Sequence, residues 1–286
     1  MRVLLSFPLL VLAGLPGFGS TASGPLPFKA SPVPGGVAVV RINSAESTPK
    51  VAYHGEPVLL RRSGKDWLAV VGIPLSAKTG RDTLDVDGRT VPFTIIAKRY
   101  PEQRLRLENQ RQVTPGAEDE ARIAREQALI GTAWKAWPEG FVPSLEFRQP
   151  TPGALSSSFG LRRVFNGEPR APHSGLDIKA PAGQAVRAPA AGVVVLTGDF
   201  FFSGNAVFLA HGEGVVSLFA HLSKVSVHKG QVLKAGDQLG EVGMTGRATG
   251  PHLHWSLSLN NARVDPRILG IGKPPSHSRR HPGARK

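Results

Sequence analysis

The chain has 286 residues, which exceeds the usual size of one domain, so we expect two domains. Its formal net charge of +14 favours a polyanionic partner, such as nucleic acid, anionic lipid or an anionic cell wall. The chain has no cysteine, which excludes disulfides, a lipid attached to an N-terminal cysteine, and zinc sites built on cysteine.

The first residues have the pattern of a signal peptide, which we place at residues 1–22. Arg2 precedes an apolar run that ends near Leu15, and small residues follow, with Ser20 and Ala22 in position for cleavage after Ala22. The apolar run is shorter than the ~20 residues that a membrane-spanning helix needs. We therefore expect an exported protein, in the periplasm or outside the cell, without stable membrane insertion once the signal peptide is cleaved.

Residues 23–100 are predicted to form a β-sandwich-like domain. Short stretches rich in valine and isoleucine alternate with glycine, aspartate and serine turns, as is typical of successive strands. These stretches are "GVAVVRI", "PVLLRR", "DWLAVVGI", "DTLDVDG" and "TVPFTIIAKRY". The histidine in this part, His54, is interpreted as a surface residue without a chemical role.

Residues 101–144 are predicted to form a linker that contains a helix. The apolar pattern changes to a helical period in "PGAEDEARIAREQALIGTAWKAWPEG", and acidic residues occupy the first turn, where the helix dipole favours them. One helical stripe carries the large apolar residues Ile123, Ile130, Trp134 and Trp137. Pro138 and Gly140 are expected to end this helix, which we interpret as a connecting helix packed across a domain.

Residues 145–270 return to a β pattern and are predicted to form the second domain. The stretches "QAVRAPAAGVVVLTG", "NAVFLAHGEGVVSLFAHL" and "QVLKAGDQLGEVGMTG" indicate successive strands and hairpins. Residues 271–286 are basic, without an acidic residue, and contain too little apolar surface to fold alone, so we expect a disordered tail. The predicted fold class is therefore mainly β, with one connecting helix.

Histidines concentrate in the second domain in a pattern that predicts a metal site. His173 and Asp177 are four residues apart in "PHSGLDI", and an even spacing in an extended segment places both side chains on one face. His252 and His254 are two residues apart in "HLHW", so in a strand both imidazoles share a face. Two imidazoles and one carboxylate are a typical ligand set for catalytic zinc, with the fourth position left for water.

The spacing alone does not select which ring of "HLH" would bind the metal. The other ring and His221, in "SLFAHLS", are then available for acid–base chemistry, since an unperturbed imidazole titrates near neutral pH. The chain lacks "HExxH", whose glutamate is the base in many zinc proteases, so histidine is the available proton carrier. His211 and His228 occur in turn-like contexts and receive no role.

The stretches "PHSGLDI", "FAHLS" and "GMTGRATGPHLHW" resemble the three motifs of the M23 peptidases, the lysostaphin-type zinc endopeptidases of bacterial cell walls. The resemblance extends through "SSFGLRRVFNG", "GQAVRAPAAGVV" and "NNARVDP", and so covers about residues 150 to 270. It implies an antiparallel β barrel-like domain with a groove between loops, and zinc held by His173, Asp177 and His254. It also implies that His221 and His252 are the catalytic histidines.

The function implied is a secreted zinc metalloendopeptidase that hydrolyses peptide cross-links of peptidoglycan, with a D-alanyl to diaminopimelate bond favoured over glycine bridges. The alternative is a non-catalytic LytM-type activator of cell-wall amidases, but such relatives lack ligand residues that this chain has. A carrier or phosphotransfer domain finds support in "APAAGVVV", against which the export signal and the ligand set argue. Nucleic acid is excluded because no basic stripe is interleaved with aromatic residues.

Two further details follow from the resemblance. Many members have a tyrosine two residues before the catalytic histidine, where this chain has Phe219, and loss of that hydroxyl would affect substrate positioning and not zinc binding. Gly175, Gly243, Gly246 and Gly250 are interpreted as turn residues, with Gly250 also available to let a substrate backbone approach.

Overall fold

The computed structural model describes residues 26–43, 48–106 and 110–269. The predicted signal peptide and the predicted basic tail lie outside these residues. The described part is mainly β, as predicted, and contains one α-helix, α1 (Ala117–Trp134), with the short 3-10 helices η1 (Gln110–Gln112) and η2 (Pro266–Leu269). No helix in the described part has the length and apolar character needed to cross a bilayer.

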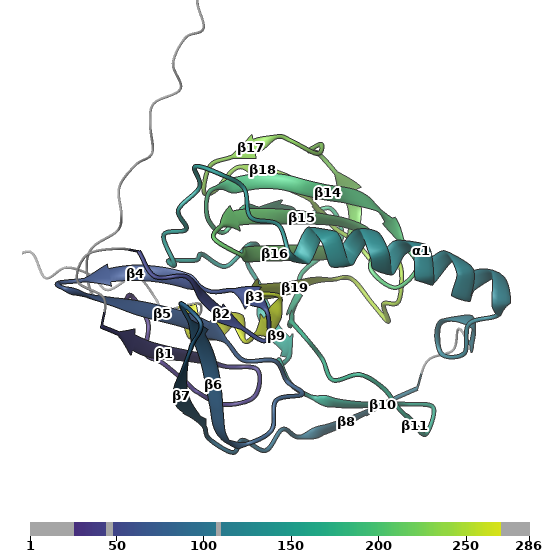
Figure 1. Ribbon diagram of the computed structural model, residues 1–286. Helices are drawn as coiled ribbons and strands as arrows, with labels where there is room; N and C mark the ends of the chain where they lie inside the picture. Colours follow the sequence, from purple (N-terminus) through teal and green to yellow (C-terminus); the bar gives the residue numbers. More distant parts are fainter. Residues whose placement is uncertain (1–25, 44–47, 107–109, 270–286) are drawn as a thin grey trace, which may run out of the picture.

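Two small antiparallel sheets form the N-terminal part, in agreement with the predicted sandwich-like arrangement (Figure 1). One has the order β1-β5-β4 and the other the order β3-β2-β6-β7. Their strands are β1 (Val37–Ile42), β2 (Val51–Tyr53), β3 (Glu56–Pro57), β4 (Leu59–Ser63), β5 (Asp66–Gly72), β6 (Gly80–Val86) and β7 (Arg89–Ile95). Apolar residues of both sheets, such as Ile42, Val71, Leu84 and Ile95, pack with Tyr53 into one buried cluster, which explains why these apolar stretches form strands.

The C-terminal part is built on a ten-stranded sheet, whose main path has the order β17-β14-β15-β16-β19-β12-β9. Its pairs are antiparallel, and the sheet does not close into a barrel. Its strands are β9 (Ala154–Ser157), β12 (Leu176–Lys179), β13 (Ala185–Arg187), β14 (Gly192–Phe200), β15 (Gly204–Gly212), β16 (Val215–Val225), β17 (Val232–Leu233), β18 (Gln238–Val242), β19 (His252–Leu259) and β20 (Ala262–Val264).

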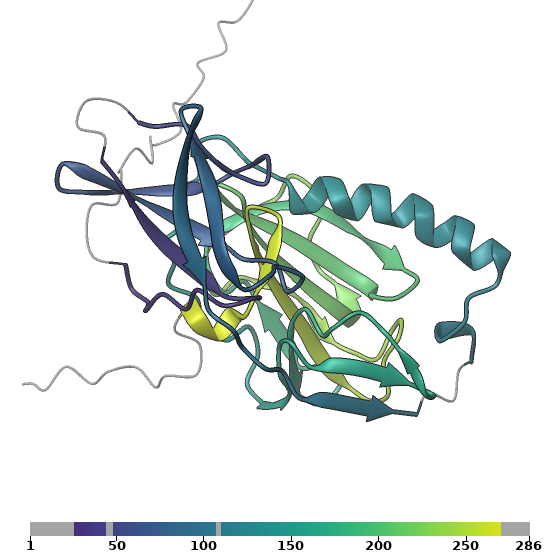
Figure 2. The ribbon, with the colours of Figure 1, turned by 60° about the horizontal axis from the view of Figure 1, so that its bottom comes forward.

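The two faces of this sheet have different environments, and β19 shows the difference. Its residues Leu253, Trp255 and Leu257 are fully buried in the main apolar core. The alternate residues, which include His254, face the other way, where α1 covers β14, β15 and β16 (Figures 1 and 2). Trp134 of α1 packs edge-on against Phe208 on this second face, with ring centroids 5.1 Å apart. The helix leaves the β19 end of this face open.

Helix α1 ends at Trp134, three residues before Trp137, the last residue of the predicted apolar stripe. Pro138 lacks an N–H group, and its ring would clash with the carbonyl four residues earlier, that of Trp134, so the helix cannot continue through it. The amide of Lys135 instead bonds the Thr132 carbonyl in a tighter final turn. Trp137 therefore lies beyond the helix and is 41% exposed.

A third sheet lies across the open end of the second face. It has the order β11-β10-β8, from strands β8 (Glu102–Leu105), β10 (Arg162–Phe165) and β11 (Glu168–Pro169). Strand β8 pairs with β10 in parallel, so the linker after the N-terminal sheets returns to the C-terminal part (Figure 2). This small sheet forms one wall of the pocket described next.

Candidate active site

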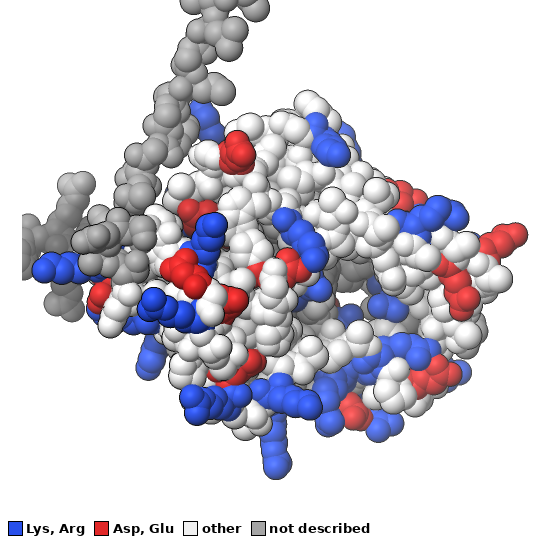
Figure 3. Space-filling view, in the orientation of Figure 1, with Lys and Arg blue, Asp and Glu red and all other residues white. Residues whose placement is uncertain are grey.

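A pocket opens between the small sheet and the uncovered part of the large sheet. Figure 3 shows a hollow on this face with Lys and Arg side chains around it. Four of the five predicted site residues line the pocket, namely Asp177, His221, His252 and His254. The fifth, His173, is 2% exposed and lies beneath them.

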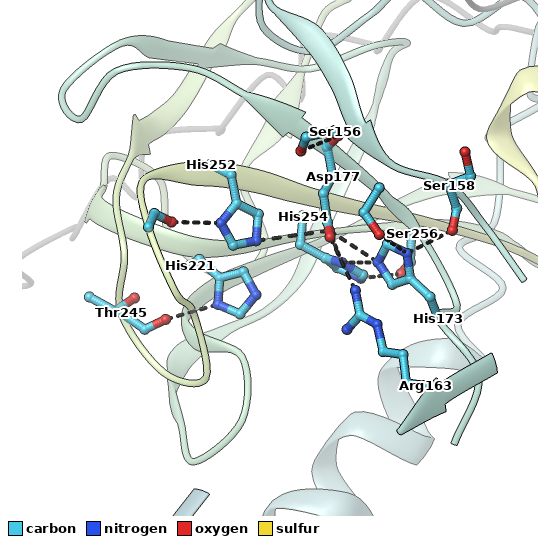
Figure 4. Close-up of polar contacts among 12 residues, drawn as sticks. Ser156, Ser158, Arg163, His173, Asp177, His221, Thr245, His252, His254 and Ser256 are labelled. Atoms are coloured by element: carbon cyan, nitrogen blue, oxygen red, sulfur yellow. Dashed lines mark hydrogen bonds and ion pairs between the residues drawn. The ribbon is translucent and has the colours of Figure 1, made fainter. Parts of the chain in front are cut away.

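Three predicted metal ligands meet at one point (Figure 4). Nε2 of His173 lies 3.0 Å from Nδ1 of His254 and 3.0 Å from Oδ1 of Asp177. Nδ1 of His254 lies 2.9 Å from the same Asp177 oxygen. The three atoms thus form a nearly equilateral triangle.

The outer hydrogen bonds of these rings show which nitrogens can face a metal. Nδ1 of His173 lies 2.9 Å from the Ser158 carbonyl, which can only accept, so this nitrogen bears the proton and Nε2 is the lone-pair atom. Nε2 of His254 lies 2.8 Å from Oγ of Ser256, and when this hydroxyl accepts the Nε2–H, Nδ1 is left to bind a metal. Two ring nitrogens and a carboxylate oxygen then direct lone pairs at one point, where a bound cation would relieve their mutual repulsion. His173, Asp177 and His254 could therefore hold a metal.

Asp177 is fixed from its other side by Arg163. The guanidinium of Arg163 donates to Oδ2 at 3.1 Å, while Oδ1 faces the two imidazoles. Burial opposes ionisation of Asp177, but the hydrogen bonds with His173 and His254 outweigh it and hold its pKa below the usual range. Asp177 is therefore ionised at neutral pH, the state that a metal ligand requires.

The register between β12 and β19 brings two of the ligands together. Asp177 lies directly opposite His254 in the antiparallel pair, so the two side chains share a face. His173 precedes β12, in a segment whose backbone amide bonds the Leu161 carbonyl. The predicted convergence of His173 and Asp177 is confirmed, although only Asp177 lies in a strand.

His221 and His252 lie beside the metal-ligand triangle, with ring centroids 4.8 Å apart. Nδ1–H of His221 donates to the Thr245 carbonyl and Nδ1–H of His252 to the Gly250 carbonyl, both at 2.8 Å. Each ring therefore carries its lone pair on Nε2, and that of His252 lies 3.9 Å from Oδ1 of Asp177. The structure thus brings all five predicted residues into one site.

His221 reaches the site through an unusual backbone conformation. In a regular strand it would share a face with Phe219, which is fully buried in the apolar core. His221 has φ +64°, in the left-handed region, and the register between β16 and β18 shifts just after it. This local bend turns the imidazole away from the core face and toward His252.

Burial keeps the imidazoles of His221 and His254 neutral. Burial, together with positive charge on His254 or His252, lowers the pKa of His221 to about 3. Burial also lowers the pKa of His254 to about 4, against the opposing effect of Asp177. Neutral imidazoles are the form that ligates metals and accepts protons.

Phe219 and the glycines differ in part from the sequence interpretation. Phe219 lies on the core face, away from the pocket, so a hydroxyl there would enter the apolar core. Gly175 and Gly243 do not have a positive φ, so a left-handed backbone does not require glycine there, but a Cβ on either would lie within 2.7 Å of neighbouring atoms. For Gly175 those atoms belong to the His254 ring and to Ser256. Gly246 does have a left-handed φ of +68°, and Gly250 faces open space.

Other residues of the site were not predicted from the sequence. Arg163 and Arg247 both line the pocket, and they come from β10 and from the loop before β19. Ser256 could have been found, because it lies two residues after His254 on the same strand face. His211 is buried in the sheet, and His228 is exposed, as is His54.

Comparisons with known proteins agree with this geometry. The model of peptidase family M23 matches residues 171–266, and that of the M23 N-terminal domain matches residues 30–98. A solved structure from Pseudomonas aeruginosa, assigned to peptidase M23, is 45% identical with a TM-score of 0.70, covering 84% of this chain and 95% of that one. The chain belongs to peptidase family M23.

Two curated relatives are similar over the C-terminal part. The DD-carboxypeptidase/endopeptidase Mpg of Neisseria meningitidis is 42% identical over 120 residues, which are 42% of this chain and 28% of that protein. The peptidoglycan DD-endopeptidase ShyA of Vibrio cholerae is 41% identical over 112 residues, 39% of this chain and 26% of that protein. The matched part of the chain thus spans less than a third of each relative.

Proposed function

We propose that this chain is an exported zinc metalloendopeptidase that hydrolyses the peptide cross-links of bacterial peptidoglycan. The observation that carries the proposal is the convergence of His173, Asp177 and His254 on one point, with His221 and His252 beside it in an open pocket. The names of the Neisseria and Vibrio relatives support a peptidoglycan substrate with DD cross-links. That substrate lies outside the cytoplasm, in keeping with the signal-like start of the sequence.

The donor set fits zinc. Two imidazole nitrogens and one carboxylate oxygen make a three-residue catalytic set, and ligands about 2.0–2.2 Å from a tetrahedral ion lie roughly 3.3 to 3.6 Å apart. The distances of 2.9 to 3.0 Å between the donors need only a small expansion to reach that range. When bound, zinc would supply a Lewis acid that polarises a peptide carbonyl and makes water a stronger acid.

His221 and His252 are placed to move protons. The Nδ1–H groups are held by backbone carbonyls, so both rings are fixed in the tautomer with a free Nε2. A neutral Nε2 can accept a proton from the attacking water and return it to the leaving amine. In its protonated form the same atom can donate to the oxyanion that develops on the scissile carbonyl.

The proposal is tested by incubating purified sacculi with the zinc-loaded protein and identifying the released muropeptides by mass. We expect loss of cross-linked dimers, a gain of monomers, and no change when a chelator is present. Unchanged sacculi would contradict the peptidase. If they were instead solubilised only after an amidase was added, the result would favour a non-catalytic activator.

A further inference from the structure

A second functional group lies in the same pocket, in the loop between β18 and β19. Arg247 lines the pocket together with the metal-site residues Asp177 and His254. Its guanidinium carbon lies 4.4 Å from the ring centre of Phe202 and 5.2 Å from that of Phe165. Its backbone amide bonds the Phe202 carbonyl at 2.9 Å. Arg247 is therefore held in place by its backbone and by aromatic contacts.

Arg247 has no acidic partner among the residues that the structure describes. The aromatic rings stabilise its charge but provide no oxygen acceptor for its N–H groups. The neighbouring cations are already engaged, Arg163 with Asp177 and Arg170 with Glu168. Burial, together with the charges of Arg163 and Arg170, lowers the pKa of Arg247 to about 10, so it remains charged at neutral pH.

The side chains that line the pocket carry more positive than negative charge. Its lining contains three cationic side chains, Arg163, Lys179 and Arg247, and one acidic side chain, Asp177. Asp177 is used by the ligand triangle and by Arg163. A half-buried guanidinium with free donors in such a pocket favours an anionic group on the ligand, because a carboxylate can accept two parallel hydrogen bonds from it.

We propose that Arg247 binds a free carboxylate of the substrate, so that the substrate class is a peptide with a carboxylate next to the scissile amide. The inference rests on the proposed peptidase function and deepens it. Arg247 thus determines substrate specificity, because it contacts a carboxylate of the substrate that takes no part in the reaction.

The test uses a cross-linked dimer of stem peptides with free diaminopimelate carboxylates, and its counterpart in which those carboxylates are amidated. Binding is measured by calorimetry to the zinc-loaded His252→Ala protein, in which hydrolysis is slow, and cleavage is measured with the wild type. Amidation and Arg247→Gln should each weaken binding about 10- to 100-fold, the scale of a hydrogen-bonded charged pair. Because both changes remove the same pair, their combination should cost little more than either alone.

Two further variants control for charge and folding. Arg162→Gln removes the same formal charge from an exposed side chain of the adjacent β10 that is paired with Glu102, and it should change binding less than 2-fold. Arg247→Lys keeps the charge and the contacts to Phe165 and Phe202 but loses the planar fork, so binding should be intermediate.

Equal binding of the free and amidated dimers by the His252→Ala protein, or equal weakening of both by Arg247→Gln, would overturn the assignment. If the dimers bind as expected but the wild type cleaves neither, the peptidase function fails while the carboxylate contact stands.

Discussion

Gly175 shows how closely the backbone approaches the metal ligands. A Cβ at this position would lie 2.6 Å from both Cε1 and Nε2 of His254 and 2.7 Å from Oγ of Ser256. Nε2 of His254 and Oγ of Ser256 form the hydrogen bond that orients the His254 ring. A side chain at Gly175 would therefore shift the ring of His254, a proposed zinc ligand, without removing it.

We accordingly expect Gly175→Ala to weaken zinc binding by about 10- to 100-fold, the usual scale for losing an outer-shell contact. Competition with a chromogenic chelator measures this affinity. Gly250→Ala is the matched control, since a Cβ there meets nothing within 4 Å, and its zinc affinity should equal that of the wild type. An affinity of Gly175→Ala within 2-fold of the wild type would show that the ring tolerates the methyl group.

Arg163 affects the same ligand set from the other side. It binds Oδ2 of Asp177, which leaves Oδ1 directed at His173 and His254. Burial lowers the pKa of Arg163, and Asp177 opposes that effect. The ion pair thus holds the carboxylate with Oδ1 facing the two imidazoles, as the proposed metal site requires.

At the scale of elements, β15 contains an imidazole that links it to its neighbours. Nδ1–H of His211 donates to the Ala191 carbonyl before β14, and Nε2 accepts from Oγ of Ser217 in β16, both at 2.8 Å. Burial lowers the pKa of His211 to about 4, and its residue exposure is 1%. His211 is thus a buried, neutral, structural histidine.

A histidine whose pKa is depressed by folding makes stability depend on pH. Between the ordinary pKa of about 6.5 and the folded value of about 4, the unfolded chain binds a proton that the folded protein does not. Stability is therefore complete above pH 6.5 and falls as pH drops toward 4, by on the order of 3 kcal/mol from His211.

Urea unfolding of the wild type and His211→Gln at a series of pH values tests this contribution. Glutamine does not titrate, so its curve should be flatter than that of the wild type between pH 6.5 and 4. The difference between the two proteins at each pH removes the effect of metal release, which both share. If the stabilities of the two proteins changed in parallel with pH, folding would not lower the pKa of His211.

The strands and the helix could be predicted because their patterns are local. The alternation in "HLHWSLSL" predicts β19 and places His252 and His254 on one face, and the structure confirms both. The spacing could not show which ring joins Asp177, because that depends on the register between β12 and β19, almost 80 residues apart. The family resemblance, and not the spacing, supplied that choice.

Other parts of the site could not be predicted from local patterns. Alternation places His221 on the core face with Phe219, and only the left-handed backbone of His221 brings it to the pocket. Arg163 and Arg247 meet through tertiary packing around Phe165, a contact that no periodicity indicates. The positions of these side chains depend on how distant segments pack, and a local sequence pattern does not predict that packing.

In the whole molecule, one of the two N-terminal sheets, β1-β5-β4, shares an apolar core with the large sheet. Val37, Leu59 and Val70 pack in the same cluster as the core face of β19. The side chain of Asn260 accepts from the Gly72 amide at 2.7 Å and donates to the Gly72 carbonyl at 3.0 Å, which satisfies both backbone groups. The N-terminal part thus supports the sheet that carries the site.

Within "HLH", His254 is proposed to bind zinc and His252 to transfer protons, and zinc content measured beside hydrolysis separates these two roles. We expect His254→Ala to lose most of its zinc after dialysis and to lose hydrolysis with it. His252→Ala should keep near-stoichiometric zinc, yet its hydrolysis of peptidoglycan should fall by about 10²-fold or more, the scale for losing an acid–base group. If His252→Ala lost the metal while His254→Ala retained it, the account of this site would be contradicted.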